Sequence, residues 1–93
     1  MLFTHVIEDG TLQVTLQGQL DVTSRAAGAL EIEALVYVHR PHRVTVQVPA
    51  GDPTPATLSA VLRAYRTCKS LGIPLTLRGG TPSARRLFAV NTA

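Results

Sequence analysis

The side chains most often used in catalysis are few in this chain and poorly spaced for chemistry. The single cysteine, Cys68, lies on an apolar stripe beside Leu71, and a thiol in such surroundings is inert rather than nucleophilic. Of the three histidines, His39 and His42 are close in sequence, but Pro41 puts a turn between them and no cysteine or carboxylate stands nearby. We therefore expect no metal site, no cofactor and no enzymatic activity.

Hydroxyl groups gather instead where two expected helices begin. The segment PAGDPTPAT at 49–57 carries Thr54 and Thr57 among three prolines, and the segment GTPSAR carries Thr81 and Ser83. A helix N-terminus offers unpaired N–H groups and the positive end of the helix dipole, so it can hold an anion. Helix capping alone accounts for these residues, and we expect Thr57 and Thr81 to act as caps.

Charge is divided unevenly along the chain. Residues 1–52 carry three arginines and six acidic residues, whereas residues 53–93 carry six basic residues and no acidic one. A basic half could meet nucleic acid, a lipid headgroup or an acidic protein, or simply hydrate one helical face. Nucleic-acid binding is disfavoured, because sheet modules of that kind display stacking aromatic residues and here Phe3, Tyr37 and Tyr65 are all expected in the core.

The chain of 93 residues, 45% of them hydrophobic, is predicted to form a single domain over 1–93. No apolar run approaches the roughly 18 residues that a membrane span needs, and the start MLFTHVIEDG lacks the pattern of a secretory signal. One cysteine cannot form an internal disulfide, so a reducing, cytoplasmic location is expected. The oligomeric state is left open.

The N-terminal segments predict a β-hairpin. FTHVIE and TLQVTLQG flank the pair Asp9-Gly10, which favours a tight turn. In the second segment Leu12, Val14 and Leu16 alternate with polar residues, so this strand should have one buried and one polar face.

Two helices are predicted by apolar residues spaced three and four apart. The first lies within 19–40, with Thr23 or Ser24 as its cap and Gly28 at a close packing contact. Its apolar stripe consists of Ala27, Leu30, Ala34, Tyr37 and Val38. The second helix ends at Gly72, and its stripe consists of Leu58, Val61, Leu62, Tyr65, Cys68 and Leu71, with Arg63, Arg66 and Lys69 on the opposite side.

RVTVQV at 43–48 and PLTLRG at 74–79 predict two further strands, and TPSARRLFAV predicts a last helix with Pro82 in its first turn. The element order is therefore β-β-α-β-α-β-α. Strands separated by helices pair in parallel, so the fold class is α/β, a small mixed sheet with helices packed on it.

This order, together with the local sequences, resembles the STAS domain, the fold of bacterial anti-sigma factor antagonists. GQLDVTSRAAGALEIEAL (18–35) is similar to that family's Gly-x-Leu-Asp segment and first helix, and RVTVQV to its central strand. LSAVLRAYRTCKSLGIPLTLRGGTPSARRLF (58–88) is similar to its second helix, its Gly-ended strand and the helix that follows that strand. The resemblance implies a single STAS-like domain over 1–93, shortened at the C-terminus, where members add a last strand and helix.

The sequence departs from the family at the position that carries phosphate in phosphorylation-controlled members. Their loop before the second helix reads Asp-Ser-Ser-Gly-Leu, and the second serine is modified. Alignment on Leu58 places Ala56 there, which has no hydroxyl, although a shifted alignment would bring Thr54 or Thr57 into its place. The prolines of this loop fix φ near about −65°, so it should lose little entropy when a partner docks.

The resemblance implies a non-enzymatic protein-interaction module. It would bind an anti-sigma factor of the serine-kinase type, regulate sigma-factor-dependent transcription and escape control by serine phosphorylation. The implied partner-binding residues are Asp21, Thr23, Ser24, Asp52, Pro53, Thr54, Pro55, Ala56, Thr57, Ser59 and Arg63.

Two alternative functions stay open. Short STAS proteins also serve as accessory subunits of lipid-transport ABC ATPases, which contact the same loop. A basic nucleic-acid-binding domain would instead bind through Arg63, Arg66, Lys69, Arg85 and Arg86, and its affinity would fall steeply with salt.

Overall fold

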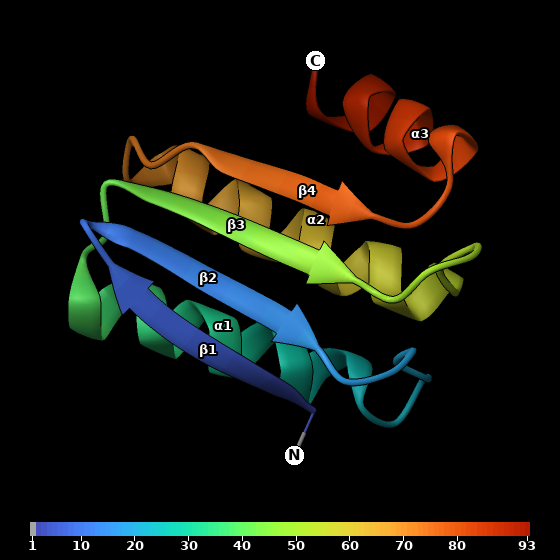
Figure 1. Ribbon diagram of the computed structural model, residues 1–93, viewed down its shortest axis with the longest axis horizontal. Helices are drawn as coiled ribbons and strands as arrows, with labels where there is room; N and C mark the ends of the chain where they lie inside the picture. Colours follow the sequence, from blue (N-terminus) through green and yellow to red (C-terminus); the bar gives the residue numbers. More distant parts are fainter. Residues whose placement is uncertain (1) are drawn as a thin grey trace.

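The computed structural model describes residues 2–93 and contains four strands and three helices in the order β-β-α-β-α-β-α (Figure 1). The strands are β1 (Phe3–Glu8), β2 (Thr11–Leu16), β3 (Arg43–Val48) and β4 (Leu75–Gly79). The helices are α1 (Arg25–His39), α2 (Pro55–Ser70) and α3 (Pro82–Thr92). The predicted α/β class and element order are confirmed.

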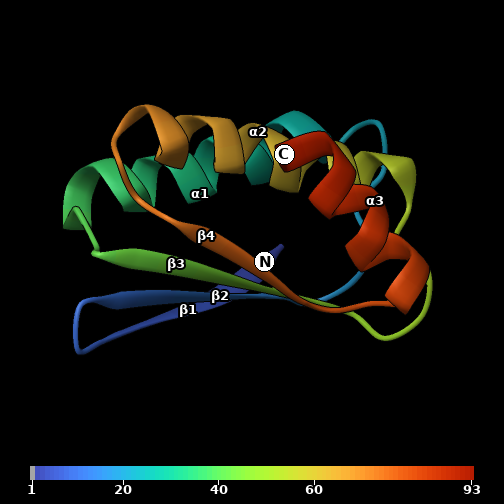
Figure 2. The same ribbon diagram turned by 90° about the horizontal axis from the view of Figure 1, so that it is seen from above.

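The strands form one mixed sheet in the order β1-β2-β3-β4. β1 and β2 are antiparallel, whereas β2–β3 and β3–β4 are parallel. Asp9 and Gly10 close the predicted hairpin with φ values of 53° and 78°, the left-handed backbone that a two-residue hairpin turn requires. All three helices cover the same face of the sheet (Figure 2).

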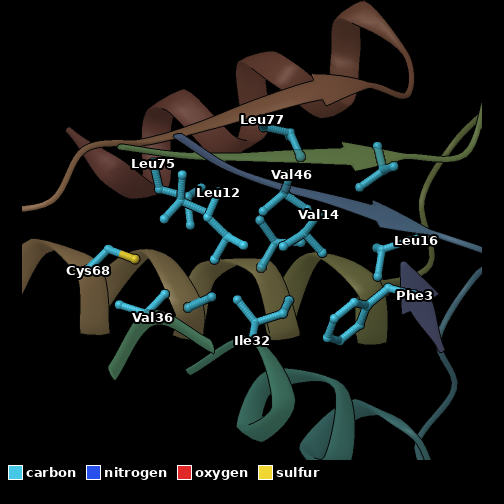
Figure 3. Close-up of a cluster of buried hydrophobic side chains, with 14 of the residues drawn as sticks. Phe3, Leu12, Val14, Leu16, Ile32, Val36, Val46, Cys68, Leu75 and Leu77 are labelled. Carbon is cyan, nitrogen blue, oxygen red and sulfur yellow. The ribbon is translucent and has the colours of Figure 1, made fainter. Parts of the chain in front are cut away.

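The hydrophobic core lies between the sheet and the helices (Figure 3). In β2 the predicted alternation is confirmed, because Leu12, Val14 and Leu16 are buried while Gln13 and Thr15 are exposed. The other strands and the three helices complete the core, chiefly with Phe3, Val44, Val46, Val48, Leu75, Leu77, Ile32, Val36, Val61, Cys68 and Phe88. The apolar sides of β2 and β3 therefore hold the helices on one face of the sheet.

The predicted apolar stripe of α1 is wrong. All five residues assigned to it are exposed: Ala27, Leu30, Ala34, Tyr37 and Val38. The helix instead buries Ala29, Ile32 and Val36 against the core. Both sides of this helix are apolar, so spacing alone does not tell which one meets the sheet. Gly28 does lie at the predicted close contact, since a Cβ there would be 3.1 Å from Leu20 Cδ1.

In α2 the predicted stripe is correct in part. Val61 and Cys68 are fully buried, whereas the other predicted members are only half-buried, namely Leu58, Leu62, Tyr65 and Leu71. The centre of the buried side holds Ala60 and Ala64. Small side chains let neighbouring elements come close, so α2 turns its alanines inward and its larger residues toward the margins of the core.

The helix ends follow the expected stop signals. Gly72 ends α2 with a φ of 73°, and the N–H groups of Gly72 and Ile73 donate to the carbonyls of Lys69 (3.1 Å) and Cys68 (2.8 Å), the pattern of a Schellman motif. Arg40 ends α1 with a φ of 45°. In the described part of the chain, no helix combines the length and apolar character needed to cross a membrane.

Candidate functional site

The candidate site is built from the loops that follow the three parallel strands. The loops after β2, β3 and β4 all lie at the same edge of the sheet, where the strands end (Figure 1). In open α/β sheets this carboxyl edge is the usual place for binding. The predicted docking residues come from the first two of these loops and from the start of α2.

Thr54 connects two of these loops and caps α2. Its Oγ1 accepts the N–H of Thr57 (3.1 Å), the expected bond of a helix cap. The same hydroxyl donates to the carbonyl of Leu20 (2.6 Å), and the N–H of Thr54 donates to Oε1 of Gln19 (2.9 Å). The predicted cap at Thr57 is therefore wrong, and the cap lies three residues earlier.

Thr57 is completely buried, with 0% exposure. Its Oγ1 accepts the N–H of Leu20 (2.8 Å) and lies within bonding distance of Gln19 Oε1 (2.9 Å) and Thr54 Oγ1 (2.8 Å). Since Thr54 gives its own hydroxyl proton to Leu20, the single proton of Thr57 has two available acceptors. We call Gln19, Leu20, Thr54 and Thr57 the threonine junction.

The third loop is attached through Asp52. Thr81 Oγ1 donates to Asp52 Oδ1 (2.7 Å) and accepts the N–H of Ala84 (3.2 Å). Thr81 therefore caps α3, as predicted. The negative charge next to the N-terminus of this helix is supplied by the carboxylate of Asp52. Gly79 has a φ of 82°, and a Cβ there would collide with the carbonyl oxygen of Val48, so the ends of β3 and β4 are closely packed.

Ser24 stands at the N-cap position of α1, as predicted, but its hydroxyl bonds to Asp21 rather than to the first turn of the helix. The N–H of Ser24 also donates to Asp21 Oδ1 (2.8 Å), and the N–H of Asp21 donates to Ser24 Oγ (3.0 Å), a reciprocal arrangement like a capping box. The backbone N–H of Ser24, together with its hydroxyl, lowers the pKa of the Asp21 carboxyl, because these bonds favour the charged form.

The structure separates the predicted docking residues by accessibility. Ala56 and Thr57 are buried, with 9% and 0% exposure, and Thr57 is hydrogen-bonded to the loop that follows β2, so neither side chain is accessible to a partner in this conformation. The half-buried members are Ser24, Pro53 and Thr54. The exposed members are Asp21, Thr23, Asp52, Pro55, Ser59 and Arg63; we call these six residues the carboxyl-edge surface.

A groove between α2 and α3 continues this surface. It has a volume of about 290 Å³ and is lined by Pro55, Leu58, Ser59, Leu62, Arg66, Leu87, Phe88 and Asn91. Arg63 lies on the other side of α2, where its Nε donates to Glu33 Oε1 at 2.9 Å. The α3 side of the groove was not predicted, because the position of α3 beside α2 depends on tertiary packing.

The junction residues Gln19 and Leu20 were also missed. Their partners lie 34 to 38 positions away in the sequence, and a glutamine before a leucine carries no local signal for such contacts. The resemblance of residues 18–21 to the Gly-x-Leu-Asp segment includes both positions, but it assigns a role to neither residue.

The single cysteine lies inside the core rather than at this edge. Cys68 is buried, as predicted, and burial raises the pKa of its thiol to about 11, with a further contribution from the negative charge of Glu33. Within residues 2–93, no three His, Cys, Asp or Glu side chains cluster as a metal site would require.

Fold and site together define a small α/β protein with a mixed four-stranded sheet, helices on one face and a hydrogen-bonded polar junction at the carboxyl edge. Among models of known protein families, none matches the chain, and a comparison with curated proteins finds no match either.

Proposed function

We propose that the chain is a non-enzymatic protein-interaction module of the anti-sigma factor antagonist type, which docks through the carboxyl-edge surface. Its partner would be an anti-sigma factor of the serine-kinase class, and its effect would fall on sigma-factor-dependent transcription. The proposal rests on the STAS-like sequence segments and on the accessibility of the residues that the resemblance assigns to docking.

The observation that carries the proposal is the threonine junction. Its hydrogen bonds hold the loop after β2 against the start of α2, while Asp21, Pro55 and Ser59 remain exposed on the two segments that it joins. A surface held in place before binding loses little conformational entropy when a partner docks. Such a surface suits recognition of a protein partner.

The junction also bears on phosphorylation. Thr57 is inaccessible, and the hydroxyl of Thr54 is engaged with the Leu20 carbonyl at 2.6 Å. A phosphate on either residue would bring about −1.5 to −2 charges and would break the bonds that position the loop. Because neither hydroxyl is free to receive a phosphate in the folded protein, we propose that serine or threonine phosphorylation does not switch this protein at the position used by other members.

Binding is tested with purified anti-sigma factors of the serine-kinase class, by biolayer interferometry. Ser59→Trp places a large side chain on the carboxyl-edge surface and should lower the affinity at least about tenfold, about 1.4 kcal/mol. Ser70→Trp is the matched control, because Ser70 is an exposed serine at the far end of the same helix. Equal affinities for the two variants would contradict the proposed surface.

The same assay separates the alternative functions. Binding to the ATPase subunit of a lipid transporter, lost in Ser59→Trp, would move the assignment to a transporter accessory subunit and overturn the sigma-factor role. Binding to nucleic acid that falls steeply with salt would overturn the protein-docking proposal altogether.

Modification is tested by incubating the protein with such a kinase and ATP, followed by intact-mass spectrometry. We expect no mass increase on the folded protein. A phosphate mapped to Thr54 or Thr57 would contradict the proposed independence from phosphorylation, whatever the result of the binding assay.

A further inference from the structure

One edge of the sheet has unused backbone groups. β1 pairs with β2 on one side, and no strand of residues 2–93 pairs with its other side. A two-residue turn makes Glu8 and Thr11 a bond-exchanging pair, and such pairs alternate along an antiparallel ladder. The 3.0 Å bond from the N–H of Gln17 to the carbonyl of Leu2 follows the same alternation. The N–H and C=O groups of Phe3, His5 and Ile7 therefore point outward.

This edge carries none of the usual protection against pairing. Exposed edge strands are normally blunted by proline, lysine, a bulge or an inward charge. β1 has the sequence FTHVIE, without proline or lysine, and its uninterrupted register with β2 leaves no bulge. Its one acidic residue, Glu8, lies next to the turn. Val6 is 54% exposed and Ile7 is 40% exposed, so both sides of the strand present apolar surface.

The apolar surface continues from this edge onto α1. A groove of about 350 Å³ runs between β1 and α1, lined by Phe3, His5, Glu31, Ala34, Leu35 and Val38. Val38 is 75% exposed. Ile7 lies on the same side of β1 as the buried Phe3, because both are paired with inward-facing residues of β2. Unlike Phe3, however, Ile7 stays partly exposed to solvent.

We propose that this edge binds a second copy of the chain, with the two β1 strands antiparallel and the two-fold axis at His5. In this register Phe3 faces Ile7 of the second copy and Thr4 faces Val6 of the second copy, so side chains on each face of the sheet stay matched. Phe3, His5 and Ile7 supply the outward bonds of both strands. Ile7 of each copy then reaches the groove of the other.

β1 can pair with β1 of a second copy in a register that matches the side chains on both faces of the sheet. A two-fold contact requires such a self-complementary surface, so we favour a second copy over a strand of another protein. Charge also permits it. α1 runs in the same direction as β1 (Figure 1), and the rings of His5 and His39 are 6.4 Å apart. Glu31 precedes His39 by about 12 Å of helix, so the two Glu31 carboxylates would lie on opposite sides of the axis and apart from each other, each at the wall of the groove that Ile7 of the other copy reaches.

The size of the contact bears on the affinity of the dimer. A standard interface buries roughly 800 Å² on each partner, which is about 15% of this chain's surface of 5309 Å². The proposed contact joins one six-residue edge and one groove of each copy, and we expect a weak dimer with a dissociation constant on the order of 10 µM. The interface goes beyond the proposed function, since it uses no residue of the carboxyl-edge surface.

Sedimentation equilibrium of the purified chain, taken to about 200 µM, tests the proposal because a dimer with that affinity would then predominate. His5→Pro removes one outward N–H while leaving the inward ladder intact, a position where proline is tolerated, and it should lower association at least about tenfold. His5→Val removes the imidazole but keeps the N–H, and it should still dimerise.

A second pair of variants tests the groove without touching the backbone. Val38→Glu should also lower association at least about tenfold. Val90→Glu is its control, because Val90 is equally exposed (74%) but lies on α3. A monomer at the highest concentration, a dimer that survives both His5→Pro and Val38→Glu, or equal loss with Val90→Glu would each overturn the proposal.

Discussion

Thr57 connects the two segments of the candidate site through one buried hydroxyl. The side chain is fully buried, and its Oγ1 accepts the N–H of Leu20 at 2.8 Å. A buried N–H that loses its acceptor costs free energy, because water cannot replace the bond. The residue that a shifted alignment offers as a phosphate acceptor is thus a structural residue of the threonine junction.

We predict that Thr57→Val, which keeps the shape but removes the hydroxyl, lowers the free energy of unfolding by about 1–3 kcal/mol. Urea denaturation followed by circular dichroism measures the change. Thr67→Val is the control, a half-buried threonine on the same helix, and should change stability by less than about 0.5 kcal/mol. Equal losses in the two variants would show that the Thr57 hydroxyl has no special role.

Cys68 gives the fold a dependence on alkaline pH. Burial, aided by the Glu33 charge, raises the pKa of its thiol from 9.0 to about 11. Above pH 9.0 the unfolded chain loses a proton that the folded chain retains, so this contribution is fully present below that pH and is lost as the pH rises through about 11.

We therefore expect the wild type to lose on the order of 2 kcal/mol more stability than Cys68→Ala between pH 8 and about 11. Guanidinium denaturation of both proteins at the two pH values gives the difference, from which the other titrating groups cancel. Parallel pH profiles for the two proteins would refute the role of the thiol.

At the scale of elements, the order of strands and helices followed from local signals. The Asp9-Gly10 pair, the alternation in β2 and the stop at Gly72 each act within a few residues, and each is confirmed. The buried side of α1 could not be predicted in the same way, because Leu30 and Ile32 are both apolar and only the sheet decides between them.

The candidate site shows the same division. Loop positions and the cap at Thr81 were predictable from turn and capping chemistry. The burial of Thr57 was not, because it depends on Gln19 and Leu20, which the pairing of β2 with β3 places beside it. Long-range hydrogen bonds of this kind leave no periodic signal in the sequence.

A pair of alanine substitutions, one on each side of α1, tests which side of the helix faces the core. Ile32→Ala should lower the free energy of unfolding by about 2–5 kcal/mol, because Ile32 is 1% exposed and its loss leaves a cavity. Leu30→Ala should cost less than about 1 kcal/mol, since Leu30 is 53% exposed. Thermal or urea denaturation decides the matter, and the reverse order of the two losses would restore the stripe predicted from spacing.

For the molecule as a whole, stability should be graded from the centre of the sheet outward. Val14 in β2 and Val46 in β3 are 1% and 0% exposed and are flanked by strands on both sides. α3 buries little more than Ala84 and Phe88. α3 is also held by Tyr65 of α2. The rings of Tyr65 and Phe88 pack edge to face, with their centroids 5.8 Å apart, and the Tyr65 hydroxyl donates to the carbonyl of Thr92 at 3.1 Å.

We predict that native-state hydrogen exchange will find α3 opening locally while β2 and β3 stay closed, because a helix with few buried residues separates at less cost than the core unfolds. Phe88→Ala should speed exchange along α3 at least about tenfold, about 1.4 kcal/mol, and should change the amides of Val14 and Val46 much less. Mass spectrometry of peptic peptides, or NMR of single amides, measures both sets. If α3 exchanges only as slowly as β3 in the wild type, the helix belongs to the global unfolding unit and the graded picture is wrong.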